Sequence, residues 1–328
     1  MDRRTFLGTL AGSLSVAPYV VRAQQAGKVP LIGRLEQGPG SSATDSAFRQ
    51  GLRELGYVEG QNILLEYRYA EGRAERLPDL AAELVRLKVD VLVAGGTLAP
   101  LAAKQATSTI PIVMAAAGDP VGTGLVPSLA KPGGNVTGLS NLSRDLTAKR
   151  LQLLKEMVPG LARVAVLWNA ANIVAALHIP ETEAAARTLG LQVQSLEVRG
   201  PDDFENGLPE RKVLRPAISA GTGALALVDD PLVMQYRKPI ADFAVQNRLP
   251  STAFYKNFAE AGGLMTFGAS LPDLYRRAAT YVDKILKGAK PAELPLSSRR
   301  SSSWSSTSRP PRPSASRFRR RSYCGRIR

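Results

Sequence analysis

The 328-residue sequence contains a single cysteine, Cys324, and a single histidine, His178. Because that cysteine lies near the end of the chain, the body of the protein has no disulfide, no cysteine zinc site and no thiol nucleophile. One histidine excludes mechanisms that need paired histidines, and a serine triad would have to use His178. We expect His178 to lie on a helix surface. We also expect no catalytic residue, no metal site and no cofactor.

Only one apolar stretch approaches the length of a membrane span, and it runs from Phe6 to Val21. It is shorter than the roughly 20 apolar residues that a span needs, and it is interrupted by Gly8, Gly12 and Pro18. A basic start before it and a small-residue motif ending at Ala23 are typical of a secretion signal. We predict that residues 1–23 are a signal peptide cleaved after Ala23, which makes the mature protein periplasmic. Arg3 to Leu7 fit a twin-arginine signal, and a general secretory signal fits equally well.

Acidic residues are absent from the C-terminal segment, where Ser297 to Arg328 contain ten arginines. The whole chain carries a formal net charge of +15. The first 23 residues contribute three arginines against one aspartate, so the body between the two ends carries a net charge of only +3. A nearly balanced body gives no basis for a polyanionic partner. We therefore expect no nucleic acid partner.

Short apolar runs alternate with amphipathic helical patterns along the body, as in βαβ units that build a parallel sheet. The predicted strands are 29–35, 63–69, 89–94, 111–115, 164–168, 192–198 and 224–228. The predicted helices are 43–55, 76–87, 98–107, 147–157 and 180–189. The sequence thus indicates two successive α/β units, joined near residues 139–145. No element is assigned to 206–223, whose prolines and glycines fit poorly in a helix.

Several segments between Lys28 and Pro295 form an ordered set of motifs. They are the stretch 110–140, Leu55-Gly56-Tyr57, Val166-Leu167-Trp168-Asn169, Asp229-Asp230-Pro231 and Ala261-Gly262-Gly263-Leu264-Met265. This set closely resembles ABC transporter substrate-binding proteins, in the branch that includes tryptophan- and tyrosine-type binding proteins. The resemblance implies a type I periplasmic-binding fold, in which two Rossmann-like lobes close on a ligand in the interlobe cleft. Lobe 1 is then expected at 28–143 with a return segment at about 266–295, and lobe 2 at 144–265.

The segment after Pro295 departs from this resemblance. Family members typically continue there with a strand that crosses between the lobes, whereas Ser297 to Arg317 are rich in serine, arginine and proline. A family-type ending read one base out of frame reproduces this segment, so we interpret it as a frameshift product that begins near Leu296. A basic tail that binds RNA or anionic lipid is the alternative. Residues 296–328 are expected to be disordered, which would leave one sheet edge unpaired.

The loops that follow strands are the candidate ligand site, because ligands of such sheets bind at the carboxyl ends of strands. In lobe 1 these loops contain Glu36, Gln37, Gly38, Thr97, Leu98, Ala116 and Asp119. The helix start at Thr97 can receive a carboxylate through its backbone N–H groups and hydroxyl, although Thr97 can equally be a plain N-cap. Gln37 is favoured as a ligand contact. Asp119 is favoured as a residue that closes a turn on its own backbone.

In lobe 2 the corresponding loops contain Asn169, Asp229 and Asp230. Asp229 is predicted to bind a ligand ammonium group in a partly desolvated cleft, and Asp230 to cap the helix that starts near Pro231. Tyr255 can stack on an aromatic or apolar ligand, or belong to the core.

The residues therefore favour reversible binding without chemistry. The resemblance implies the solute-binding component of an ABC-type importer, which binds an amino acid or related carboxylate. Its expected partners are this solute and a permease in the cytoplasmic membrane, with the protein itself a monomer. The alternatives are a ligand-sensing periplasmic protein and a hydrolase that uses aspartates of the cleft. A transcriptional regulator with this fold would need a helix-turn-helix before the first strand, where the signal sequence lies instead.

Overall fold

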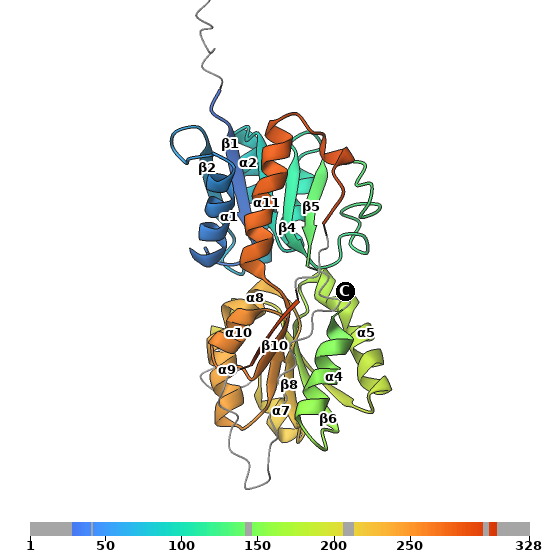
Figure 1. Cartoon of the computed structure of the whole chain (residues 1–328). Coiled ribbons are helices and arrows are strands. Elements are labelled where there is room, and N and C mark those ends of the chain that lie inside the picture. The colour runs from blue at the N-terminus through green and yellow to red at the C-terminus, as the bar shows by residue number, and fades with distance from the viewer. Residues whose placement is uncertain (1–27, 41, 142–145, 206–212, 298–301, 307–328) are drawn as a thin grey trace, which may run out of the picture.

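The computed structural model describes residues 28–40, 42–141, 146–205, 213–297 and 302–306. These residues form two α/β lobes placed end to end, with a parallel sheet in the middle of each (Figure 1). The predicted α/β class and the two Rossmann-like lobes are confirmed. The predicted signal peptide lies outside the described residues. No helix in the described part of the chain is both long and apolar enough to cross a bilayer.

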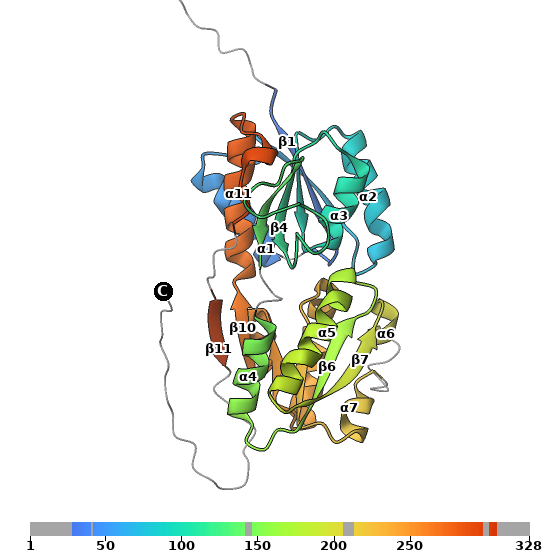
Figure 2. The ribbon, with the colours of Figure 1, turned by 90° about the vertical axis from the view of Figure 1, so that its right-hand side faces the viewer.

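Lobe 1 contains a five-stranded sheet in the order β2-β1-β3-β4-β5, in which all pairs are parallel. Its strands are β1 (Leu31–Glu36), β2 (Leu64–Tyr69), β3 (Val91–Gly95), β4 (Ile112–Ala117) and β5 (Val136–Ser140). The helices α2 (Leu77–Arg86) and α3 (Leu98–Ala106) cover one face, and α1 (Ser42–Glu54) and α11 (Leu271–Leu286) cover the other (Figure 2). Short 3-10 turns occur at η1 (Ala74–Arg76) and η2 (Pro291–Glu293). The central strands β3 and β4 are buried throughout, as their continuous apolar sequences require.

Lobe 2 contains a six-stranded sheet in the order β11-β10-β9-β8-β6-β7. Its strands are β6 (Arg163–Asn169), β7 (Gln192–Val198), β8 (Ala224–Leu227), β9 (Ser251–Ala253), β10 (Met265–Ala269) and β11 (Ser302–Ser306). The pairs are parallel except β10–β11, which is antiparallel. Its helices are α4 (Thr147–Met157), α5 (Ile173–Thr188), α6 (Pro201–Glu205), α7 (Arg215–Ser219), α8 (Pro231–Gln235), α9 (Arg237–Gln246) and α10 (Lys256–Glu260).

The predicted elements are found within a few residues of their expected bounds, with one clear exception. The helix expected at 180–189 begins at Ile173, where the Asn172 side chain caps it by accepting from the Val174 N–H. Pro180 therefore lies inside this helix. The structure also buries His178, which is 3% exposed, so its predicted surface position was wrong. The unassigned interval 206–223 contains α7, and residues 206–212 of it are outside the described part.

Between residues 28 and 306, the described elements show that the chain passes between the lobes after Asn141, after β10 and after Ser297. Because β10 belongs to the sheet of lobe 2, the return to lobe 1 starts at Ser270, a few residues later than the predicted 266. The returning helix α11 then packs tightly on α1. A Cβ added to Gly51 of α1 would lie 2.2 Å from the Arg276 carbonyl oxygen, so glycine allows the two helices to approach.

The C-terminal segment is ordered where the structure describes it. Ser297 bonds to β5, since its N–H donates to the Gly138 carbonyl at 3.0 Å and its carbonyl accepts from the Ser140 N–H at 3.1 Å. Leu296 is buried in lobe 1, and β11 pairs along the edge of β10. The predicted disorder was therefore wrong for Leu296, Ser297 and β11, and the predicted unpaired edge of β10 is occupied. Residues 307–328 are outside the described part of the chain.

Candidate functional site

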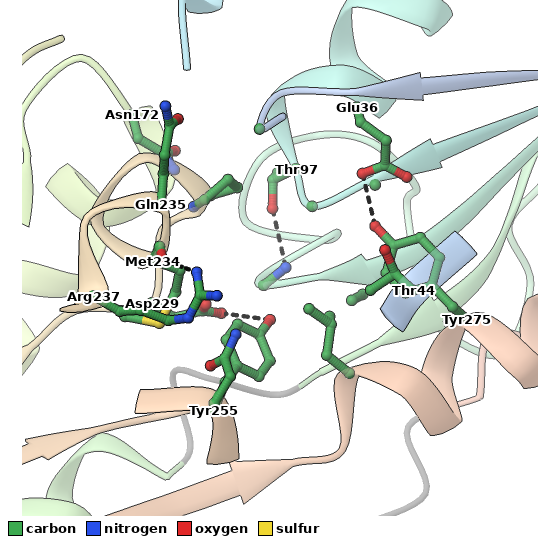
Figure 3. A pocket seen from close by; sticks show the side chains of 18 of the residues that line it. Glu36, Thr44, Thr97, Asn172, Asp229, Met234, Gln235, Arg237, Tyr255 and Tyr275 are labelled. Atoms are coloured by element: carbon green, nitrogen blue, oxygen red, sulfur yellow. Dashed lines mark hydrogen bonds between the residues drawn. The ribbon is translucent and has the colours of Figure 1, made fainter. Parts of the chain in front are cut away.

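A cavity of about 160 Å³ lies between the two lobes and is lined by residues of both (Figure 3). It is located where the carboxyl ends of the two parallel sheets face each other, as expected for doubly wound lobes. A cavity of about 150 Å³ is large enough for a benzene ring. The site therefore has room for a small solute.

In lobe 1, Thr97 lies at the turn between β3 and α3 and lines the cavity. Its hydroxyl accepts a hydrogen bond from the Gly118 N–H at 3.0 Å and makes no capping bond to α3. Thr97 is therefore the N-cap residue of α3 by its backbone, while its side chain does not cap the helix. The hydroxyl instead joins the loop after β3 to the loop after β4, and its own hydrogen can be donated to a ligand.

Ala116 lines the same wall with an unusual backbone conformation. Its φ is 98°, a region that residues other than glycine rarely adopt. It lies at the position where the pairing of β4 with β5 shifts register, between Ala115 and Ala117. Such strain costs on the order of 1–3 kcal/mol and is typical of functional sites. At this position the strain shapes the wall of the cavity.

A buried charged cluster lies behind this wall. Arg34 and Glu36 point to the same face of β1 because they are two residues apart. The guanidinium of Arg34 contacts Glu36 and donates to Asp45 Oδ1 at 2.6 Å, while the Tyr275 hydroxyl donates to Glu36 Oε2 at 2.8 Å. The Arg34 side chain is 0% exposed and that of Glu36 is 14% exposed. Only Glu36 and Tyr275 of this cluster line the cavity.

The chemistry of this cluster follows from burial and charge. Burial would lower the pKa of Arg34, but Glu36, Tyr275 and Asp45 outweigh it and the pKa is raised, so Arg34 stays charged. Burial raises the pKa of Glu36 although Arg34 opposes this effect. The guanidinium carbon of Arg34 also lies 4.9 Å from the ring centre of Tyr275 and 5.2 Å from that of Phe48.

In lobe 2, Asp229 follows β8 and lines the opposite wall. Its Oδ2 accepts from the Asn141 side-chain amide at 2.7 Å and from the Tyr255 hydroxyl at 3.3 Å. Burial raises the pKa of Asp229 to about 6, while the nearby Arg150 opposes this effect. Arg150 is buried on α4, and its burial lowers its pKa to about 10 in spite of Asp229. Asp229 thus sits between the cavity and an internal positive charge.

The neighbouring Asp230 has the structural role that the sequence predicts. Its side chain accepts from the Val233 N–H at 3.0 Å and caps α8. It also accepts from the side chains of Asn169 at 3.2 Å and Asn172 at 2.7 Å. Asn169 is 1% exposed and is not among the residues that line the cavity. The structure therefore places Asn169 as a support for Asp230.

The nine residues singled out from the sequence fall into two groups. Those that line the cavity are Gly38, Thr97, Ala116, Asp229 and Tyr255. Those that do not are Gln37, Leu98, Asp119 and Asn169. Gln37 is buried, and Asp119 accepts from the Gly122 N–H at 2.9 Å, which is the turn role favoured for it.

Glu36 lines the cavity, as expected for the loop after the first strand, although it was given no ligand role. The sequence did not point to several other lining residues: Thr44, Asn172, Gln235, Arg237, Asn257 and Tyr275. Tyr275 belongs to the returning helix α11, so its place depends on the packing of α11 against lobe 1. The cavity combines carboxylates, amides and a guanidinium with aromatic and apolar walls, a surface suited to a small polar solute. The described residues contain no group of three or more His, Cys, Asp or Glu that could hold a metal ion.

Known proteins are similar to this chain over most of its length. A family model described as "ABC transporter substrate binding protein" matches residues 28–304. A tyrosine-binding protein of Clostridioides difficile is 28% identical over 269 residues, which are 81% of this chain and 74% of that protein.

Two solved structures share the fold. A conserved domain protein from Vibrio cholerae has a TM-score of 0.76 at 26% identity, covering 85% of this chain and 92% of its own. An ABC domain from Streptococcus pneumonia in complex with L-Trp has a TM-score of 0.72 at 24% identity, covering 83% of this chain and 91% of its own. The matches thus extend over both lobes.

Proposed function

Because this chain belongs to the family of ABC transporter substrate-binding proteins, we propose that it binds an amino acid or related carboxylate between its lobes and delivers it to a membrane permease. Members of this family bind solutes and are not enzymes. The observation that carries the proposal is the cavity itself, which both lobes line with polar groups, including the carboxylates of Glu36 and Asp229 and the guanidinium of Arg237. A solute bound there would hold the two lobes together.

The ligand class is supported by the site chemistry and by one relative. An amino acid carries a carboxylate and an ammonium group, and each would be costly to bury without a partner. The start of α3 at Thr97 offers N–H groups to a carboxylate, and the cavity contains the carboxylates of Glu36 and Asp229. A relative described as a tyrosine-binding protein supports an amino acid with a ring-sized side chain. We infer contacts with Gly38, Thr97, Ala116, Asp229 and Tyr255.

The cellular setting is part of the same proposal. We infer that residues 1–23 direct export and that the mature protein acts in the periplasm as a monomer. Its partners would be the solute and a permease of the cytoplasmic membrane, with no nucleic acid partner. The nearly balanced charge of the body supports the last point.

A thermal-shift screen of the chain from residue 24 onward tests the ligand class. The screen would use L-tyrosine, L-tryptophan, the other common amino acids and simple sugars. A ligand present at 100 times its Kd stabilises the folded state by about 2.7 kcal/mol. We expect at least one amino acid to raise the melting temperature in a dose-dependent manner. A rise only with sugars, or with none of these solutes, would overturn the proposal.

A further inference from the structure

We propose that Glu36 binds the ammonium group of the ligand, a role that the sequence alone had assigned to Asp229. This inference rests on the proposed function, because it presumes an amino acid in the interlobe cavity. It is carried by the balance of buried charges on the two walls and by the spacing of the strand ends.

The charges behind the lobe 1 wall do not cancel. Arg34 is one positive charge, and Glu36 and Asp45 are two negative charges in contact with it. Asp45 faces the interior, where its Oδ1 accepts from Arg34 at 2.6 Å and its Oδ2 accepts from the Tyr69 hydroxyl at 2.9 Å. The pair Arg34–Asp45 is therefore balanced by itself. Glu36 is the surplus negative charge, and its carboxylate is the one that reaches the cavity.

The lobe 2 wall has no such surplus. Asp229 interacts with the positive charge of Arg150 behind it, and a second guanidinium, Arg237, lines the cavity beside it (Figure 3). One oxygen of Asp229 already accepts from Asn141 and Tyr255. The positive charge of a ligand ammonium group would therefore be neutralised more fully by Glu36 than by Asp229.

The Glu36 carboxylate is also held in a defined position. Tyr275 and Arg34 each donate to a different oxygen, and an ionised carboxylate has about four lone-pair sites, so acceptor capacity remains for a ligand N–H. Gly95 of β3 leaves space for this arrangement. A Cβ added there would lie 2.0 Å from Glu36 Oε2 and 2.1 Å from the Tyr275 hydroxyl oxygen.

The spacing of the strands supports the same assignment. β1 and β3 are adjacent, with Leu35 opposite Ala94, and paired strands are about 5 Å apart. Glu36 at the end of β1 and the turn at Thr97 after β3 therefore lie at neighbouring strand ends. The ammonium and carboxylate of an α-amino acid are attached to the same carbon. Both can therefore be bound by lobe 1 at once, whereas Thr97 and Asp229 belong to different lobes. The ligand side chain would then point toward lobe 2.

Calorimetric titration with two probes distinguishes the two acids. The probes are L-tyrosine and 3-(4-hydroxyphenyl)propanoate, which differ only in the amine. Glu36→Gln keeps a side-chain oxygen that can accept from Arg34, and the charge of Arg34 is still neutralised by Asp45. The variant should therefore fold, which circular dichroism would check. We expect Glu36→Gln to weaken L-tyrosine binding at least about 30-fold with a change of less than about threefold for the propanoate. Tyr275→Phe should give a smaller loss with the same selectivity for the amine.

The matched variant Asp229→Asn should weaken both probes to a similar extent, because it alters the wall without removing the amine partner. A selective loss of L-tyrosine in Asp229→Asn, or equal effects on both probes in Glu36→Gln, would overturn the assignment to Glu36. Absence of L-tyrosine binding by the unaltered protein, together with a negative amino acid screen, would instead refute the proposed function.

Discussion

The carboxyl group of Asp229 is buried at the edge of the cavity. Because burial shifts its pKa, the stability of the folded protein depends on pH. Its pKa is raised from 3.8 to about 6 by burial. The folded state therefore binds a proton more readily than the unfolded state between these two values. The contribution of Asp229 to the unfolding free energy is therefore fully present below about pH 4 and is lost as the pH rises through about 6. Burial raises the pKa of Glu36 and Asp230 as well, so they act in the same direction.

We predict that the unfolding free energy of the ligand-free protein, relative to that of Asp229→Asn, is greater at pH 4.5 than at pH 7.5. The expected difference is on the order of 1–3 kcal/mol, since each pKa unit corresponds to about 1.4 kcal/mol. Urea denaturation of both proteins at the two pH values would measure it. The variant serves as the control for all other titrating groups. A constant difference between the two proteins would contradict the buried state of Asp229.

The Thr97 hydroxyl links two loops of the cavity wall, and its removal should affect binding. Thr97→Ala leaves the Gly118 N–H without its acceptor, and we expect a loss of about 1 kcal/mol in ligand binding. Thr97→Ser keeps the hydroxyl and should bind almost as the parent does. Titration with the amino acid found in the screen would compare the three proteins. Equal affinity in the alanine variant would show that the hydroxyl does not organise the wall.

Residues at strand ends could be predicted in part from the sequence. Thr97 and Asp229 were found because a turn after a buried strand is a strong local signal, and the α/β pattern brings such turns to one edge. Glu36 was expected at this edge without a role and Tyr275 was not expected there, because the roles of both depend on the buried Arg34. The pattern of β1 gave no reason to expect an arginine at 0% exposure among aromatic rings. Such a contact arises only when α1 and α11 pack on the same face.

At the scale of elements, the periodicity of apolar residues predicted most of the strands and helices. The errors in this prediction have identifiable causes. α5 was expected to start at Pro180, but the structure places this proline inside the helix. The actual start is at the Asn172 cap, one of the residues that support Asp230. β11 was missed because its serine-rich sequence has little apolar content. Its register against β10, with Phe267 opposite Trp304, is a tertiary contact rather than a local preference.

We predict that β11 stabilises the protein by protecting the edge of β10. Deletion of residues 298–328 removes this strand and should lower the unfolding free energy by on the order of 2–5 kcal/mol, because several ladder hydrogen bonds are lost. An exposed edge should also promote association, which light scattering would detect. The control is deletion of residues 307–328, which keeps β11 and should change stability by less than about 0.5 kcal/mol. Equal stability of the two truncated proteins would show that β11 contributes nothing.

At the scale of the whole molecule, the described residues form two lobes with a cavity between them. Among the described residues the chain passes between the lobes after Asn141, after β10 and after Ser297. Outside the cavity the lobes meet through contacts such as the ion pair of Arg73 with Asp202 at 3.3 Å. Because this ion pair is exposed, it contributes little. The alternation of strands and helices predicted two units, and the family resemblance predicted a return segment at about 266–295, whereas the strand order of each sheet came from the structure.

The most direct test of this account is a crystal structure of the mature chain grown with the amino acid that gives the largest thermal shift. We predict that the amino acid lies in the cavity between the lobes and contacts residues of both, with its ammonium group at Glu36 and its carboxylate at the start of α3. A ligand bound outside this cavity, or one held by a single lobe while the other remains apart, would contradict the claim that the two lobes capture the solute together.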